Sequence, residues 1–179
     1  MVRTRLVVWL LAASTFAAVP RPAVAQDEPK ATVAGAYTYL REKGTGDFGV
    51  TVYTIGWAAA VSRRIAGRWS GAGELGISTS RNAFDERQQL LGLLGGVRFE
   101  LVRRSRLALF AQGLAGYERF WEPGLVDSGF AFQPGAGLDL RLWSQFFVRV
   151  QGDYRMSRQG GATLNDVRVL VGAGVAIGR

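Results

Sequence analysis

The chain has 179 residues, of which 22 are Lys or Arg and 14 are Asp or Glu, so its formal net charge is +8. It contains neither cysteine nor histidine. That excludes a disulfide framework and removes the commonest general base and neutral metal ligand. The basic residues are scattered singly along the chain and form no basic stripe, so the sequence does not indicate nucleic-acid binding.

The first 25 residues have the pattern of a secretory signal peptide. Arg3 and Arg5 precede an apolar run that is too short to span a membrane as a helix, and Ala23–Ala25 supplies a small-x-small cleavage site. A polar lead over residues 26–31 follows. We therefore predict an exported protein with a cleaved signal peptide and one domain over residues 32–179.

Eight runs of alternating apolar and polar residues make up the rest of the chain. Because strand side chains point alternately to two faces, each run predicts a β-strand with one apolar face. The stretch Leu90–Leu94 is also compatible with a helix, but the clean alternation after it favours a strand. Phe110 and Leu114 fit poorly, because they stand on the polar face of their run. The predicted strands cover residues 32–40, 50–62, 68–78, 89–102, 106–120, 130–142, 146–154 and 166–177.

The connections between these strands alternate in length. The long ones are rich in Gly, Asp, Glu, Ser and Arg and cover Arg41–Gly49, Thr79–Gln88, Trp121–Gly129 and Ser157–Asn165. The short ones cover Arg63–Gly67, Arg103–Ser105 and Trp143–Gln145. This alternation, with strands of about ten residues, is typical of an outer-membrane barrel whose short turns face the periplasm. The sequence therefore predicts an all-β fold, an eight-stranded antiparallel up-and-down transmembrane β-barrel.

The two faces of the predicted strands differ in charge. From the second strand to the eighth, the centres of the apolar faces carry no charge, which suits contact with lipid. The other face carries five acids and five bases, which we expect to form a network of pairs in the lumen. If the hairpin turns about Ser144, Asp139 lies opposite Arg149. The ten lumen residues are Glu74, Arg98, Glu100, Glu118, Asp139, Arg141, Arg149, Asp153, Arg155 and Arg168.

Aromatic residues gather at the strand ends and not at the strand centres. Since Trp and Tyr favour membrane–water interfaces, they predict two aromatic girdles. The residues near the short turns are Trp69, Trp143, Phe146 and Phe147, and those near the long connections are Tyr39, Tyr53, Phe120 and Trp121.

Two stretches carry a resemblance to a known family. Pro134–Leu140 reads PGAGLDL and Gly73–Gly76 reads GELG. With its strand order, the chain resembles the small outer-membrane β-barrel family that includes OmpA-type transmembrane domains, OmpX and the opacity proteins. The resemblance implies an eight-stranded barrel in the bacterial outer membrane, with lipid and the outer-membrane assembly machinery as partners. Such barrels usually end in an aromatic residue, whereas this chain ends in Gly178 and Arg179.

The sequence leaves several functional classes open. The first is a structural or surface-interaction protein with a sealed lumen, which touches envelope partners through its long loops. The second is a narrow channel or a barrel that binds or transports a small solute, and a third is a soluble periplasmic barrel of lipocalin type. No catalytic, cofactor-binding or metal-ligating set is expected. Without histidine, no serine has a recognisable base, and Asn82, Asp85 and Glu86 lack the spacing of a calcium loop.

Overall fold

The structure is a computed structural model that describes residues 29–43, 50–81, 87–159 and 162–178. The predicted signal peptide, and the lead up to residue 28, lie outside these residues. Within them, no helix is long and apolar enough to cross a membrane.

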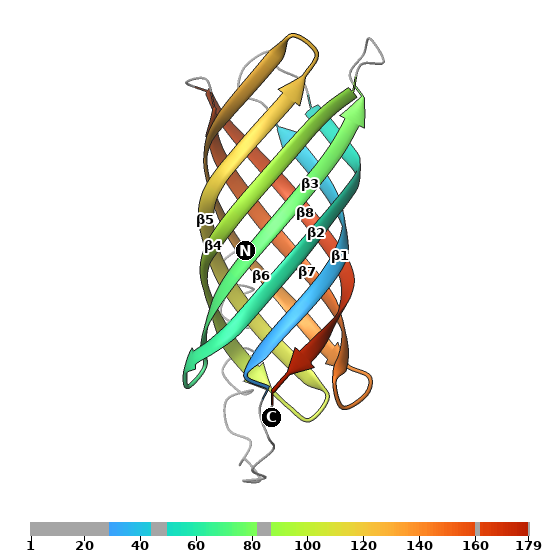
Figure 1. Cartoon of the computed structure of the whole chain (residues 1–179), viewed down its shortest axis with the longest axis vertical. Helices are drawn as coiled ribbons and strands as arrows, with labels where there is room; N and C mark the ends of the chain where they lie inside the picture. The colour runs from blue at the N-terminus through green and yellow to red at the C-terminus, as the bar shows by residue number, and fades with distance from the viewer. Residues whose placement is uncertain (1–28, 44–49, 82–86, 160–161, 179) are drawn as a thin grey trace, which may run out of the picture.

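Eight antiparallel strands form one closed barrel, as predicted (Figure 1). Each strand pairs with its neighbours in sequence, and the first and last strands pair with each other, for example at Val33 and Val175. The beginning of the first strand and the end of the last therefore lie at the same end of the barrel, together with the three short turns. The strands are β1 Ala31–Lys43, β2 Val50–Ala66, β3 Trp69–Arg81, β4 Arg87–Arg103, β5 Leu107–Glu122, β6 Leu125–Arg141, β7 Phe146–Gln159 and β8 Ala162–Ile177.

The strands are longer than predicted at the end opposite the short turns, so the predicted connections Trp121–Gly129 and Ser157–Asn165 are wrong. The middle parts of the other two predicted connections, Arg41–Gly49 and Thr79–Gln88, lie outside the described residues. Where Trp121–Gly129 was expected to be a loop, β5 and β6 run on and are joined only by Pro123 and Gly124. Gly124 has a φ of 80°, which suits a tight turn. The sequence did not reveal these extensions because they lack a continuous apolar face, although the backbone pairing continues through them.

A β-bulge in the β1–β2 pair reverses the predicted direction of one girdle residue. The register shifts between Thr38 and Leu40, so that Leu40 lies opposite Tyr53. As a result Tyr53 is only 1% exposed and points into the barrel, while Ile55 is 58% exposed. An extra residue in one strand turns the side chains beyond it to the other face.

The interior contains apolar layers between its polar groups. One cluster joins Leu40, Tyr53 and Leu90, with Phe120 packed against it. Another joins Leu94 and Leu114 to Ala131. Leu114 does not fit the alternating pattern because the lumen face carries apolar residues as well as polar ones.

Candidate functional site

A connected set of polar side chains crosses the middle of the lumen. Arg168 from β8 donates hydrogen bonds to Asp153 of β7 at 2.6 and 3.0 Å and lies 2.7 Å from the carboxylate of Glu74 on β3. Its side chain is only 2% exposed. Gln151 donates to the same Asp153 carboxylate at 2.9 and 3.1 Å. One guanidinium therefore links two carboxylates across strands that are not neighbours in the sheet.

The same set continues to the opposite wall through Gln133. Its amide nitrogen donates to Glu74 at 3.3 Å, and its amide oxygen accepts from Arg155 at 2.9 Å. Arg155 in turn forms an ion pair with Glu118 on β5. These residues, together with Arg168, Asp153 and Gln151, form what we name the central network, which spans five strands of the barrel. Buried charges held by several hydrogen-bonded partners are costly to separate.

A second layer lies nearer the short turns. Arg149 makes two hydrogen bonds of 2.7 Å to the carboxylate of Asp139, its neighbour across β6 and β7, so the predicted opposition of these two residues is confirmed. Arg98 donates to Gln112 at 2.8 and 3.2 Å. The centroid of the Phe110 ring lies 4.0 Å from the guanidinium carbon of Arg98 and 5.0 Å from that of Arg149. This layer combines an ion pair with cation–π contacts.

Inward glycines make room for the large groups of these layers. A Cβ placed on Gly137 would come within 2.4 Å of the Phe110 ring, and one on Gly174 within 2.4 Å of the Phe147 ring. A Cβ on Gly135 would come within 2.0 Å of the Asp153 carboxylate. The interior glycines therefore leave space that neighbouring side chains already occupy.

The remaining predicted lumen residues lie at the mouth beside the short turns. Glu100 is half-buried, forms an ion pair with Arg103 and lies 3.8 Å from Arg64. Arg141 is half-buried and lines a cavity at this end. A register shift between Glu100 and Val102 brings Arg103 to the same side as Glu100. The ten predicted charges thus lie in three places along the lumen and do not form one network.

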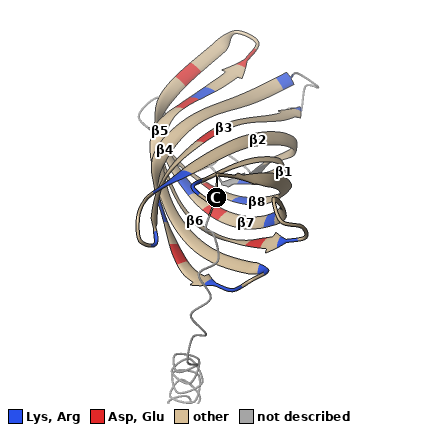
Figure 2. Cartoon of the chain, turned by 60° about the horizontal axis from the view of Figure 1, so that its bottom comes forward, with Lys and Arg blue, Asp and Glu red and all other residues tan. Residues whose placement is uncertain are grey.

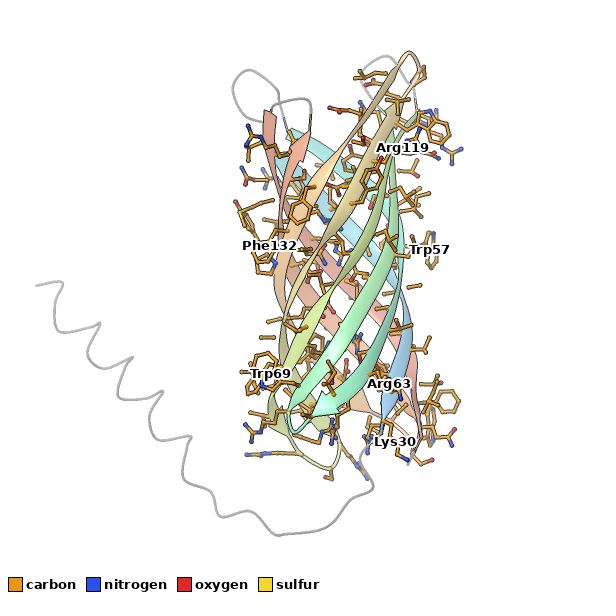
Figure 3. All side chains as sticks on the ribbon, turned by 60° about the vertical axis from the view of Figure 1, so that its left-hand side comes forward. Lys30, Trp57, Arg63, Trp69, Arg119 and Phe132 are labelled. Carbon is orange, nitrogen blue, oxygen red and sulfur yellow. The ribbon has the colours of Figure 1, made fainter. Side chains whose placement is uncertain are left out.

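An apolar belt surrounds the barrel on its outer face. On β5 it extends from Leu109 to Tyr117, and on β7 from Phe146 to Tyr154. Each of these stretches is nine residues long, close to the roughly 9–11 residues with which a tilted strand crosses a bilayer. Figure 3 shows Trp57 and Phe132 pointing away from the barrel in its middle part. They are 61% and 43% exposed.

The predicted girdle residues divide between the two faces. Five are exposed on the outer face, namely Trp69, Trp143, Phe146, Tyr39 and Trp121. The prediction is wrong for Tyr53, Phe120 and Phe147, which are turned to the interior. Phe146 and Phe147 are successive strand residues and cannot share a face, and Phe120 precedes the outward Trp121 in the same way. Trp143 and Phe146 meet edge to face with ring centroids 6.3 Å apart.

The exposed and the buried charged side chains differ in sign composition, because the interior carries both signs and the exposed positions carry only cations. Every carboxylate whose side chain is described is buried or half-buried, namely Glu74, Glu100, Glu118, Glu122, Asp127, Asp139, Asp153 and Asp166. The exposed charges of the described residues are all cations, namely Lys30, Arg41, Arg63, Arg68, Arg81, Arg87, Arg104, Arg106, Arg119 and Arg158. Figure 3 shows Arg119 near one end and Lys30 and Arg63 near the other. The exterior is thus apolar in its middle and cationic towards its ends.

Sequence reasoning missed Asp166, which is 1% exposed inside the barrel. The alternating pattern could have revealed it, because Asp166 lies two residues before Arg168 on β8 and therefore on the same face of the strand. No group of histidine, cysteine or acidic side chains within the described residues could hold a metal ion.

Solved structures with the same fold are small outer-membrane barrels. Neisserial surface protein A matches with a TM-score of 0.71 over 83% of this chain and 97% of its own, at 8% identity. Ail, the attachment invasion locus protein of Yersinia pestis, matches with a TM-score of 0.56 over 83% of this chain and 98% of its own, at 17% identity. No family model and no curated protein matches the chain. The chain therefore has the eight-stranded fold of these small outer-membrane barrels.

Proposed function

We propose that this protein is a small barrel of the bacterial outer membrane, exported by a cleaved signal peptide, with a lumen closed to solutes and a structural or surface-interaction role. The observation that carries the proposal is the arrangement of an outer apolar belt around the central network. In water an exposed apolar belt of this extent would be a liability, whereas lipid covers it.

The same arrangement weighs against a soluble lipocalin-type barrel. Such a protein would have a polar exterior and an apolar interior to hold its ligand. Here Arg149 and Arg168 are among the largest fully buried side chains, while Trp57 and Trp143 are among the most exposed apolar ones.

Ion pairs between strands that are not neighbours in the sheet support the proposal of a closed lumen. Arg168 to Glu74 and Arg155 to Glu118 both reach across the interior. The apolar cluster of Leu94 and Leu114 adds groups that do not bind water. A pore would instead be expected to carry a continuous polar lining with a surplus of one charge. We assign no catalytic role to Glu74, Glu118 or Asp153, because the central network holds them in ion pairs.

Surface interaction would take place at the end opposite the short turns, where the strands extend past the apolar belt. The exposed charges described there are Arg41, Arg81, Arg87, Arg119 and Arg158, so we propose an anionic surface as the partner. A barrel of this fold, Ail of Yersinia pestis, has been solved in complex with the heparin analogue sucrose octasulfate, with a TM-score of 0.54 and 16% identity to this chain.

Cell fractionation tests the membrane location. The protein should sediment with outer membranes, resist extraction with high salt and urea, and require detergent to stay in solution. Recovery of folded protein in a detergent-free periplasmic extract would refute the proposal.

Retention on immobilised heparin tests the surface role. Arg119→Gln/Arg158→Gln should elute at lower salt than the unmodified protein, because association through exposed charges is screened by salt. Arg63→Gln/Arg68→Gln removes the same charge from exposed positions at the other end and is the matched control. An equal shift in both variants would contradict a partner at the extended end.

A further inference from the structure

A cavity of about 70 Å³ lies in the mouth of the barrel beside the short turns. Its lining includes the β4–β5 turn Arg104–Arg106, Arg141 at the end of β6, and Lys30 just before β1. Figure 2 turns this end towards the reader and shows several blue Lys and Arg segments around it. One water needs about 10–15 Å³, so the cavity has room for several waters or for a small oxyanion.

The lining of this cavity is strongly positive. Among the described residues it includes seven cations, namely Lys30, Arg64, Arg98, Arg103, Arg104, Arg106 and Arg141, and two carboxylates, Glu100 and Asp139. Both carboxylates already have cationic partners. Glu100 contacts Arg103 and Arg64, and Asp139 is held by two hydrogen bonds from Arg149. The acids in the lining therefore do not neutralise its remaining cations.

The backbone fixes three of these arginines close together. Arg104 and Leu107 exchange backbone hydrogen bonds of 2.7 and 3.3 Å that close the turn, and the amide of Arg141 donates to the carbonyl of Arg106 at 2.8 Å. No described carboxylate forms an ion pair with Arg104, Arg106 or Arg141. Like charges held side by side destabilise a sheet, and an anion bound among them would relieve the repulsion.

The cavity is a cup and not the entrance of a path through the lumen. Phe110 and Arg98 of the second layer line it together with Phe147, and the guanidinium of Arg149 lies 5.0 and 5.2 Å from the rings of Phe110 and Phe147. The hydroxyl residues Thr32, Ser62, Ser70 and Ser105 also belong to its lining. Arginine forks and hydroxyl donors are the groups that bind phosphate oxygens.

We propose that this cup binds a phosphate group, which either a soluble phosphate compound or the headgroup of an anionic phospholipid would supply. The proposal goes beyond the structural role and does not depend on the anionic partner at the other end. The cup lies at the end of the short turns, which in an outer-membrane barrel is the periplasmic side.

Two measurements on the full-length mature barrel distinguish the two sources. Inorganic phosphate is titrated into lipid-free protein in a neutral detergent and followed by calorimetry. Separately, the protein is incubated with phosphatidylglycerol in mixed micelles, and retained lipid is detected by native mass spectrometry. We expect saturable binding in at least one arm, which identifies the source.

Arg106→Gln/Arg141→Gln should weaken that binding at least tenfold, whereas Arg119→Gln/Arg158→Gln should leave it within twofold. If the first variant does not fold, the single substitutions Arg104→Gln and Arg141→Gln should each weaken binding several-fold. Saturable binding in neither arm would overturn the proposal. Binding that both double variants weaken equally would overturn it as well, because it would then reflect net charge alone.

Discussion

Replacement of Arg168 by methionine removes the cation that joins Glu74 and Asp153 in the middle of the barrel. Arg168 is 2% exposed, and its guanidinium lies 2.6–2.7 Å from both carboxylates. Loss of one partner from a buried ion pair costs about 3–5 kcal/mol, because the remaining charge stays buried. We therefore expect the free energy of unfolding to fall by about this amount.

The matched variants separate the missing cation from the change in side-chain volume. Arg158→Met on β7 removes an exposed arginine and should change the free energy of unfolding by less than about 0.5 kcal/mol. The triple variant Glu74→Gln/Asp153→Asn/Arg168→Met removes both stranded charges with the cation and should recover most of the loss.

Urea-induced unfolding in phospholipid vesicles, followed by tryptophan fluorescence, measures all four proteins. The exposed Trp57 and Trp69 report on the transfer of the barrel surface between lipid and water. If Arg168→Met were no less stable than Arg158→Met, or if the triple variant were less stable than the single one, the ion-pair reasoning would be refuted.

Two further predictions concern the outer face and the packed interior. Val150→Arg should lower the free energy of unfolding in lipid by about 2–4 kcal/mol, whereas Val126→Arg, beyond the apolar belt, should cost about 0–1 kcal/mol; equal costs in vesicle unfolding would contradict the position of the belt. Gly137→Ala should cost about 1–3 kcal/mol, because its new methyl group meets the Phe110 ring at 2.4 Å. Gly152→Ala, with nothing within 4 Å, should be neutral or slightly stabilising, and the reverse order in the same assay would show that Phe110 does not fill this space.

The strand count, the barrel and the outer apolar belt could be predicted from the sequence, because a strand in lipid must keep one face apolar along its whole crossing. The Asp139–Arg149 pair could also be predicted, since the hairpin about Ser144 fixes its register. The pairing of two residues in a hairpin follows from their distances in sequence from the turn.

Other features of the structure could not be predicted, because the alternation of apolar and polar residues does not show where a strand bulges or which side chains meet across the lumen. The bulge beside Leu40 turned Tyr53 inward, and the strand extensions had no apolar face to reveal them. The contact of Arg168 with Glu74 joins β8 to β3, which are not neighbours, and arises only when the sheet closes. The prediction of a polar lumen did not account for Phe110 and Leu114, because apolar side chains also fill the interior of a narrow barrel.

Planar-bilayer recording of the purified, unmodified barrel tests the central claim most directly. A lumen crossed by the central network and by apolar layers has no continuous water column, so we predict a flat current trace at either polarity after insertion has been verified. Steady, reproducible nanosiemens-scale steps from the unmodified protein would contradict the closed lumen and favour a channel.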